Sequence, residues 1–154
     1  GVDALLVAEA VMISGVANEL TKNVVGRERP FVHALRENEK QTTPHPSDNQ
    51  LSFYSGHTAS TTTLAAAAGT IATLRGYRLA PAIFATGGAV AAFTGYLRIA
   101  ADKHWLTDVI AGALIGGAIG VLVPIAFHGR RADDAVSPVA PSIAPATFTL
   151  GATF

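Results

Sequence analysis

Two uncharged stretches of 19 residues each, 79–97 and 109–127, constrain the fold of this chain more than any other feature. About 20 apolar residues in a helix span the hydrocarbon core of a bilayer, so both stretches are long enough to cross a membrane. Residues 51–74 also lack Asp, Glu, Lys and Arg. An Ala- and Gly-rich helical bundle in water is the alternative, and length and composition leave both interpretations open.

Composition excludes several classes of protein. Only 14% of the 154 residues are charged, against about 25% in soluble domains, and 49% are hydrophobic, which argues against a disordered chain. The 11 basic and 11 acidic residues cancel, so a nucleic-acid partner held by bulk charge is not expected. Without cysteine, the chain has no disulfides, thiolate metal sites or cysteine nucleophiles.

The pattern of apolar residues predicts an all-α fold, because no strand alternation is present. Four helices are expected, at about residues 3–22, 55–74, 81–97 and 109–127. Asp3 is the candidate N-cap of the first helix, and Gly26 and Pro30 mark its end. Gly112, Gly116 and Gly120 recur every four residues, a spacing that lets two helices approach closely.

The chain is expected to form one helical domain over residues 1–131, followed by a Pro- and Ala-rich tail over residues 132–154. The polar stretch 32–50 is too long for a tight turn and is predicted to be a loop or lid. The sequence starts at Gly1, inside an apolar stretch and without a visible signal peptide. We therefore expect that a natural N-terminus, with any earlier helix or targeting signal, is missing.

Three polar clusters lie at the ends of the predicted helices, within 22–30, 53–58 and 97–108. Each has an ordinary explanation by itself: basic residues complement a helix C-terminus, and Ser55 can be an N-cap. Helix N-termini also bind anions. His104 and Asp108 are four residues apart, so a helix would place them on one face, where a carboxylate can fix the imidazole tautomer.

Taken together, the clusters read Lys-x6-Arg-Pro, Ser-Gly-His and Arg-x5-His-x3-Asp. In order and spacing this resembles the type 2 phosphatidic acid phosphatase superfamily, which includes bacterial acid phosphatases and vanadium haloperoxidases. The resemblance covers residues 22–108 and implies that the motifs meet at one end of a helical bundle, which in membrane members usually has two more helices before the first motif. Tyr54 replaces a frequent Pro, and Leu97 replaces a frequent Ser, which leaves substrate class and rate open.

The resemblance also implies roles for individual residues. It makes His104 the nucleophile that becomes a phosphohistidine, Asp108 its orienting partner and His57 the general acid. The implied phosphate-binding residues are Lys22, Arg29, Ser55, Gly56 and Arg98. Such cations and N–H donors stabilise the charge that develops during phosphoryl transfer, so no metal or other cofactor is expected, and vanadate should bind as a phosphate mimic. Arg27 lies in the variable gap of the first motif and receives no role.

The remaining histidines, His33, His45 and His128, are expected to face solvent. The 32–50 stretch joins the first two motifs, so it must lie near the site, either as a gate or as a passive connection.

The expected function is a metal-independent phosphoester hydrolase that releases phosphate from a lipid phosphate or isoprenoid pyrophosphate. The alternatives are a soluble periplasmic acid phosphatase of broad specificity, a vanadate-dependent haloperoxidase and a non-catalytic membrane subunit. The expected location is a bacterial-type cell membrane with the active site facing the periplasm or exterior. Four arginines on the opposite side would fit the positive-inside rule: Arg75, Arg78, Arg130 and Arg131. The oligomeric state stays open.

Overall fold

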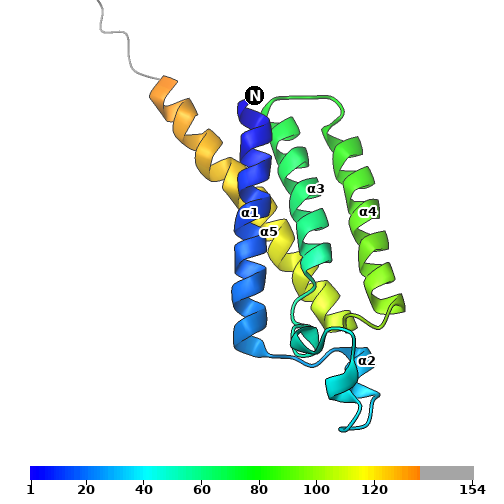
Figure 1. Cartoon of the computed structure of the whole chain (residues 1–154). Helices are drawn as coiled ribbons and strands as arrows, with labels where there is room; N and C mark the ends of the chain where they lie inside the picture. The colour runs from blue at the N-terminus through cyan, green and yellow to red at the C-terminus, as the bar shows by residue number, and fades with distance from the viewer. Residues whose placement is uncertain (136–154) are drawn as a thin grey trace, which may run out of the picture.

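The computed structural model describes the backbone of residues 1–135 and the side chains of residues 1–127. Four long helices make up the bundle: α1 (Val2–Val25), α3 (Gly56–Leu74), α4 (Ala80–Ala100) and α5 (Leu106–Ala135). Helix α3 is central, because it packs against α1, α4 and α5, most extensively against α5 (Figure 1). The described part contains no strand, which confirms the all-α prediction.

The first helix begins earlier than its sequence indicated. Gly1 occupies the N-cap position, so the prediction of Asp3 as the N-cap is wrong. Asp3 lies in the first turn, where a carboxylate complements the helix dipole, and its Oδ1 lies 2.6 Å from Arg75 Nη2. Gly26 ends the helix as predicted, with a left-handed φ of 58° that glycine adopts without strain.

A stripe of glycines brings α5 directly against the backbone of α3. A Cβ atom on Gly112 would lie 2.6 Å from the carbonyl oxygen of Ser55, and one on Gly120 would lie 2.5 Å from that of Thr63. A Cβ on Gly116, between them, would also collide with α3 backbone. The four-residue glycine spacing thus provides the close helix packing that it predicted.

Helix α5 is longer than the uncharged stretch that predicted it. It contains His128 and continues to Ala135, across the expected domain boundary. The side chains of Arg130 and Arg131, and the predicted tail beyond residue 135, lie outside the described residues.

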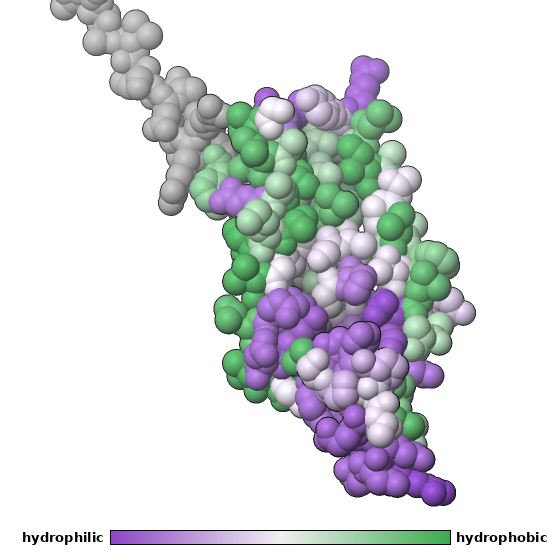
Figure 2. Space-filling view, in the orientation of Figure 1, coloured by the Kyte–Doolittle hydropathy of each residue, from purple (hydrophilic) through white to green (hydrophobic). Residues whose placement is uncertain are grey.

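Three helical stretches, Val2–His33, Ala80–Ala100 and Leu106–Phe127, are long and apolar enough to cross a membrane. Large apolar side chains on them point outward: Met12 is 70% exposed, Phe93 61% and Leu114 69%. Figure 2 shows hydrophobic residues along the helices and hydrophilic residues gathered at one end of the molecule. Apolar surface of this extent is unusual for a soluble monomer and indicates a membrane protein.

The hydrophilic end holds the polar stretch between α1 and α3 (Figures 1 and 2). This stretch contains three short helices: α2 (Pro30–His33), η1 (Lys40–Thr42) and η2 (Pro46–Asp48). The predicted loop is therefore built of successive short helical turns.

Candidate active site

Three chain segments meet at the hydrophilic end: the residues after α1, the start of α3 and the junction of α4 with α5 (Figure 1). Backbone hydrogen bonds hold them together. Ser52 N–H donates to the carbonyl of Arg27 over 2.9 Å, and Ser55 N–H donates to the carbonyl of Asp108 over 3.0 Å. All three sequence motifs are therefore assembled in one place.

His104 is 3% exposed and has a defined hydrogen bond. Its Nδ1 lies 2.8 Å from the carbonyl oxygen of Ser52. A carbonyl oxygen can only accept, so Nδ1 carries a hydrogen, and in the neutral ring Nε2 then has the free lone pair. Asp108 Oδ2 lies 3.8 Å from Nδ1, too far for a hydrogen bond. The direct orienting group is thus the Ser52 carbonyl, which revises the geometry expected for Asp108.

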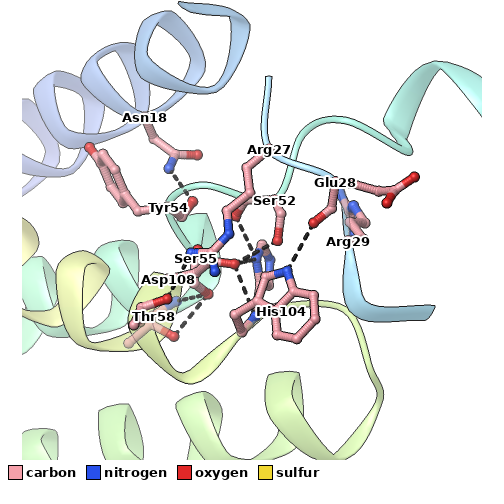
Figure 3. Close-up of polar contacts among 12 residues, drawn as sticks. Asn18, Arg27, Glu28, Arg29, Ser52, Tyr54, Ser55, Thr58, His104 and Asp108 are labelled. Atoms are coloured by element: carbon pink, nitrogen blue, oxygen red, sulfur yellow. Dashed lines mark hydrogen bonds and ion pairs between the residues drawn. The ribbon is translucent and has the colours of Figure 1, made fainter. Parts of the chain in front are cut away.

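Asp108 is fully buried and accepts hydrogen bonds from three other groups (Figure 3). Arg27 Nη1 donates to Oδ1 over 2.6 Å. Ser52 Oγ donates to Oδ2 over 2.6 Å, and the Trp105 N–H donates to the same oxygen over 2.9 Å. Charge-assisted bonds of this length fix a carboxylate firmly. Asp108 therefore joins segments from all three motifs.

His57 lies exposed in the first turn of α3, within reach of the site's cations. Partial loss of hydration at the start of α3 lowers the pKa of His57, and the positive charges of Arg98, Lys22 and Arg29 lower it further. A histidine that loses its proton easily suits a group that must donate one.

Arg98 has a buried Nε without a hydrogen-bond partner among the described residues. An unpaired buried donor is costly, so it suits a position where a ligand oxygen arrives. A hollow of about 420 Å³ lies between α1 and α3, and Lys22, Gly56 and His57 are part of its lining. Cationic and N–H groups at this end could thus receive a phosphate together.

The stretch 32–50 borders the site through Arg29. The Arg29 Nε donates to the carbonyl of Asp48 over 2.9 Å, and its backbone N–H donates to the carbonyl of Asn49 over 2.9 Å. Lys40 also forms an ion pair with Glu28 over 2.9 Å. The expected nearness of this stretch to the site is confirmed.

The start of α3 is fixed by small residues. Ser55 is the N-cap, and its Oγ accepts from the Thr58 N–H over 3.4 Å. A Cβ on Gly56 would lie 2.6 Å from Asn18 Oδ1, so only glycine fits without a shift. Asn18 in turn donates to the carbonyl of Tyr54 over 2.7 Å, while the Tyr54 side chain is buried in the position where the family often has Pro.

The described residues hold no group of three or more His, Cys, Asp or Glu side chains that could bind a metal ion. His33 and His45 are exposed, as expected, and His33 forms a 3.2 Å contact with Glu28. The side chain of His128 lies outside the described residues. Leu97, where the family often has Ser, points largely outward at 47% exposure.

Sequence reasoning missed several residues of the site, chiefly Arg27, Ser52, Asn18 and Trp105. Arg27 contacts Asp108 across 81 positions of sequence, a pairing that no local spacing signals. Trp105 joins the motifs as well, because its Nε1 donates to the carbonyl of Glu28 over 2.9 Å.

The sequence is similar to those of known phosphatases. A segment of 71 residues is 39% identical to a lipid A 1-phosphatase of Porphyromonas gingivalis, and covers 46% of this chain and 15% of that protein. The chain therefore matches only a small part of that curated relative's length. No solved structure matches the chain. Residues 3–132, most of the sequence, match the PAP2 superfamily, and the chain belongs to that family.

Proposed function

We propose that this chain is a phosphoester hydrolase that acts on lipid phosphates through a phosphohistidine at His104. The observation that carries the proposal is the 2.8 Å hydrogen bond from Nδ1 to the Ser52 carbonyl. In the neutral ring this bond leaves Nε2 without a hydrogen, which is the state that a nucleophilic histidine needs.

In the first step, the Nε2 lone pair of His104 forms a bond to phosphorus, and the bond from phosphorus to the lipid oxygen breaks. The proton of His57 moves to the departing oxygen, which as a free alkoxide would be a poor leaving group. Positioned acids of this kind contribute about 10²–10⁴-fold to the rate. Lys22, Arg29 and Arg98 would stabilise the charge on the three remaining phosphate oxygens, helped by Ser55 and the Gly56 N–H.

In the second step, water forms a bond to phosphorus and the bond to Nε2 breaks, with its electron pair returning to the nitrogen. Neutral His57 takes the proton from this water, which restores the starting state and releases inorganic phosphate. The Nδ1 hydrogen stays on the Ser52 carbonyl throughout, so the ring keeps one orientation in both steps.

A lipid phosphate or isoprenoid pyrophosphate is the proposed substrate. Two observations support it: the three apolar helical stretches that could cross a membrane, and the similarity to a protein named lipid A 1-phosphatase. Phosphate release should be measured with phosphatidic acid, phosphatidylglycerol phosphate, an isoprenoid diphosphate and a water-soluble phosphomonoester.

His104→Ala and His57→Ala are the control variants for that assay. Vanadate should inhibit and EDTA should not, because the proposed step needs no metal. Equal phosphate release by the wild type and His104→Ala would refute the mechanism. A clear preference for the water-soluble ester would refute the lipid substrate.

We further propose that the site faces the periplasm or exterior. Arg75 and Arg78 lie between α3 and α4, at the opposite end from the site, where the positive-inside rule would place them in the cytoplasm. Arg27, Arg36, Lys40 and Lys103 belong to the site end and count against this orientation, so the proposal depends on the labelling test below. The chain has no cysteine, so single cysteines can be introduced at Asn38 and Arg78. An impermeant maleimide added to intact cells should label Asn38→Cys only; labelling of Arg78→Cys alone would reverse the orientation.

A further inference from the structure

Arg27 is a cation that the proposed phosphate site does not use, although it contacts Asp108 directly. One of its nitrogens, Nη1, lies 2.6 Å from Asp108 Oδ1 and 2.7 Å from Thr107 Oγ1. Its guanidinium also lies over the Trp105 ring, 5.5 Å from the ring centre. Arg27 thus holds the carboxylate and the start of α5 at the same time (Figure 3).

Ser52 forms hydrogen bonds with Asp108, His104 and Arg27. Its side chain donates to Asp108 Oδ2 over 2.6 Å, its carbonyl accepts from His104 Nδ1 over 2.8 Å, and its N–H donates to the Arg27 carbonyl over 2.9 Å. Ser52 is fully buried. Movement of Asp108 would therefore move Ser52, and with it the group that accepts the His104 proton.

We propose that Arg27 and Ser52 are positioning residues which, through Asp108, set the orientation and tautomer of His104. Ser52 acts directly through its carbonyl oxygen. Arg27 acts at one remove: it holds Asp108 in the place where the Ser52 side chain and the Trp105 N–H can both reach it. This inference rests on the proposed function for its kinetic consequences, while the tautomer itself is measurable without any activity.

The positive charge of Arg27 compensates the negative charge of the buried Asp108 carboxylate. A buried carboxylate that loses its ionic partner is strongly unfavourable, and Asp108 is 0% exposed. Without Arg27, Asp108 would turn to another hydrogen-bond donor, and His104 Nδ1 at 3.8 Å is close by. A bond from Nδ1 to Asp108 would replace the bond to Ser52 and rotate the ring.

The test compares Arg27→Gln and Arg27→Lys with Arg36→Gln, which removes an exposed arginine of the 32–50 stretch. The purified full chain is used, and kcat is normalised to the concentration of vanadate-binding sites, so that unfolded molecules do not count. Misplacing a reacting group by about 1 Å can cost about 10²-fold in rate, so we expect kcat to fall about 10–100-fold in Arg27→Gln. Arg27→Lys should retain more activity, because it keeps a positive charge near Asp108, and Arg36→Gln should match the wild type.

Two further measurements separate positioning from other roles. The vanadate inhibition constant should change less than about threefold in Arg27→Gln, since a positioning residue does not touch the phosphate. Nitrogen-15 NMR should show His104 with its hydrogen on Nδ1 in the wild type and in Arg36→Gln, and a changed Nδ1–H resonance in Arg27→Gln. Ser52→Ala keeps the carbonyl but loses the bond to Asp108, so it should shift the same resonance.

A parallel loss of vanadate affinity and kcat in Arg27→Gln would make Arg27 a phosphate ligand and overturn the proposal. Unchanged kcat with an unchanged His104 resonance would overturn it too. If Arg27→Gln does not fold, the proposal depends on Ser52→Ala, and an unchanged His104 Nδ1–H resonance in that variant would refute it. A wild type that releases no phosphate refutes the proposed function alone, because the resonance comparison still decides whether Arg27 positions His104.

Discussion

Replacing Gly112 by alanine tests whether the glycine stripe of α5 sets the geometry of the active site. The added Cβ would lie 2.6 Å from the Ser55 carbonyl oxygen, whereas ordinary contacts begin at 3.4 Å, so the two helices must part locally by about 0.8 Å (3.4 minus 2.6). Overpacking of this kind costs about 1–3 kcal/mol. Ser55 also donates its N–H to the Asp108 carbonyl. Parting the two helices here would therefore displace the Ser-Gly-His motif from the segment that carries His104 and Asp108.

Gly117→Ala is the matched control. It lies in the same helix, but its added Cβ would meet only the Thr62 Cγ2 at 3.6 Å, an ordinary contact. Both changes gain about 1 kcal/mol of helix propensity, so the difference between the two variants isolates the packing term. Gly112→Ala should be about 1–3 kcal/mol less stable than Gly117→Ala, which corresponds to several degrees in thermal unfolding in detergent.

We expect the Gly112→Ala change to lower kcat by a larger factor than its loss of stability alone would cause. A displacement near 1 Å in a reacting constellation can cost about 10²-fold, so kcat of Gly112→Ala should fall about 10–100-fold while Gly117→Ala stays near the wild type. Equal melting temperatures and equal kcat for the two variants would refute the idea that α5 rests on α3 through this glycine.

Three smaller predictions follow from other contacts. His57 acts protonated and its pKa lies below the ordinary value of about 6.5, so kcat/KM should decline with rising pH from below pH 6.5, and an NMR titration of His57 should show the same midpoint. Arg75→Ala should leave the melting temperature close to that of the wild type, because its 2.6 Å ion pair with Asp3 is 44% and 36% exposed and is therefore screened by water. Thr63→Val should cost about 1–3 kcal/mol, because Thr63 is fully buried and the buried Ser14 hydroxyl 3.0 Å away would lose its partner; an unchanged melting temperature would contradict the assignment.

The fold was predictable where one residue type has one physical consequence. The two uncharged 19-residue stretches predicted α4 and most of α5. Gly26 predicted the end of α1, and the four-residue glycine spacing predicted a close approach between two helices. Asp3 was wrong as an N-cap because a helix can begin before its first acidic residue, and the Asp3 carboxylate instead pairs with an arginine 72 positions away.

The motifs brought together by the structure were predictable from spacing, but the contacts between them were not. The four-residue spacing of His104 and Asp108 suggested a direct hydrogen bond, and the structure places a backbone carbonyl of Ser52 in that role. No side-chain pattern predicts which backbone carbonyl will lie beside a histidine, because that depends on how the residues before α3 cross the end of the bundle. The role of Arg27 could not be predicted for a similar reason, because its partner Asp108 belongs to a helix that starts 79 positions later, at Leu106.

The burial of Asp108 links assembly of the site to its chemistry. A carboxylate removed from water is unfavourable unless charged or hydrogen-bonding partners surround it. The donors to Asp108 come from the residues after α1, from the segment before α3 and from the turn before α5, so no pair of segments can satisfy it alone. Arg29 and His104 lie in these segments, and Lys22, His57 and Arg98 lie at the helix ends beside them. A bundle that misplaces any one of these segments therefore leaves a buried charge unsatisfied, and the arrangement that stabilises Asp108 is also the one that would orient His104 in the proposed reaction.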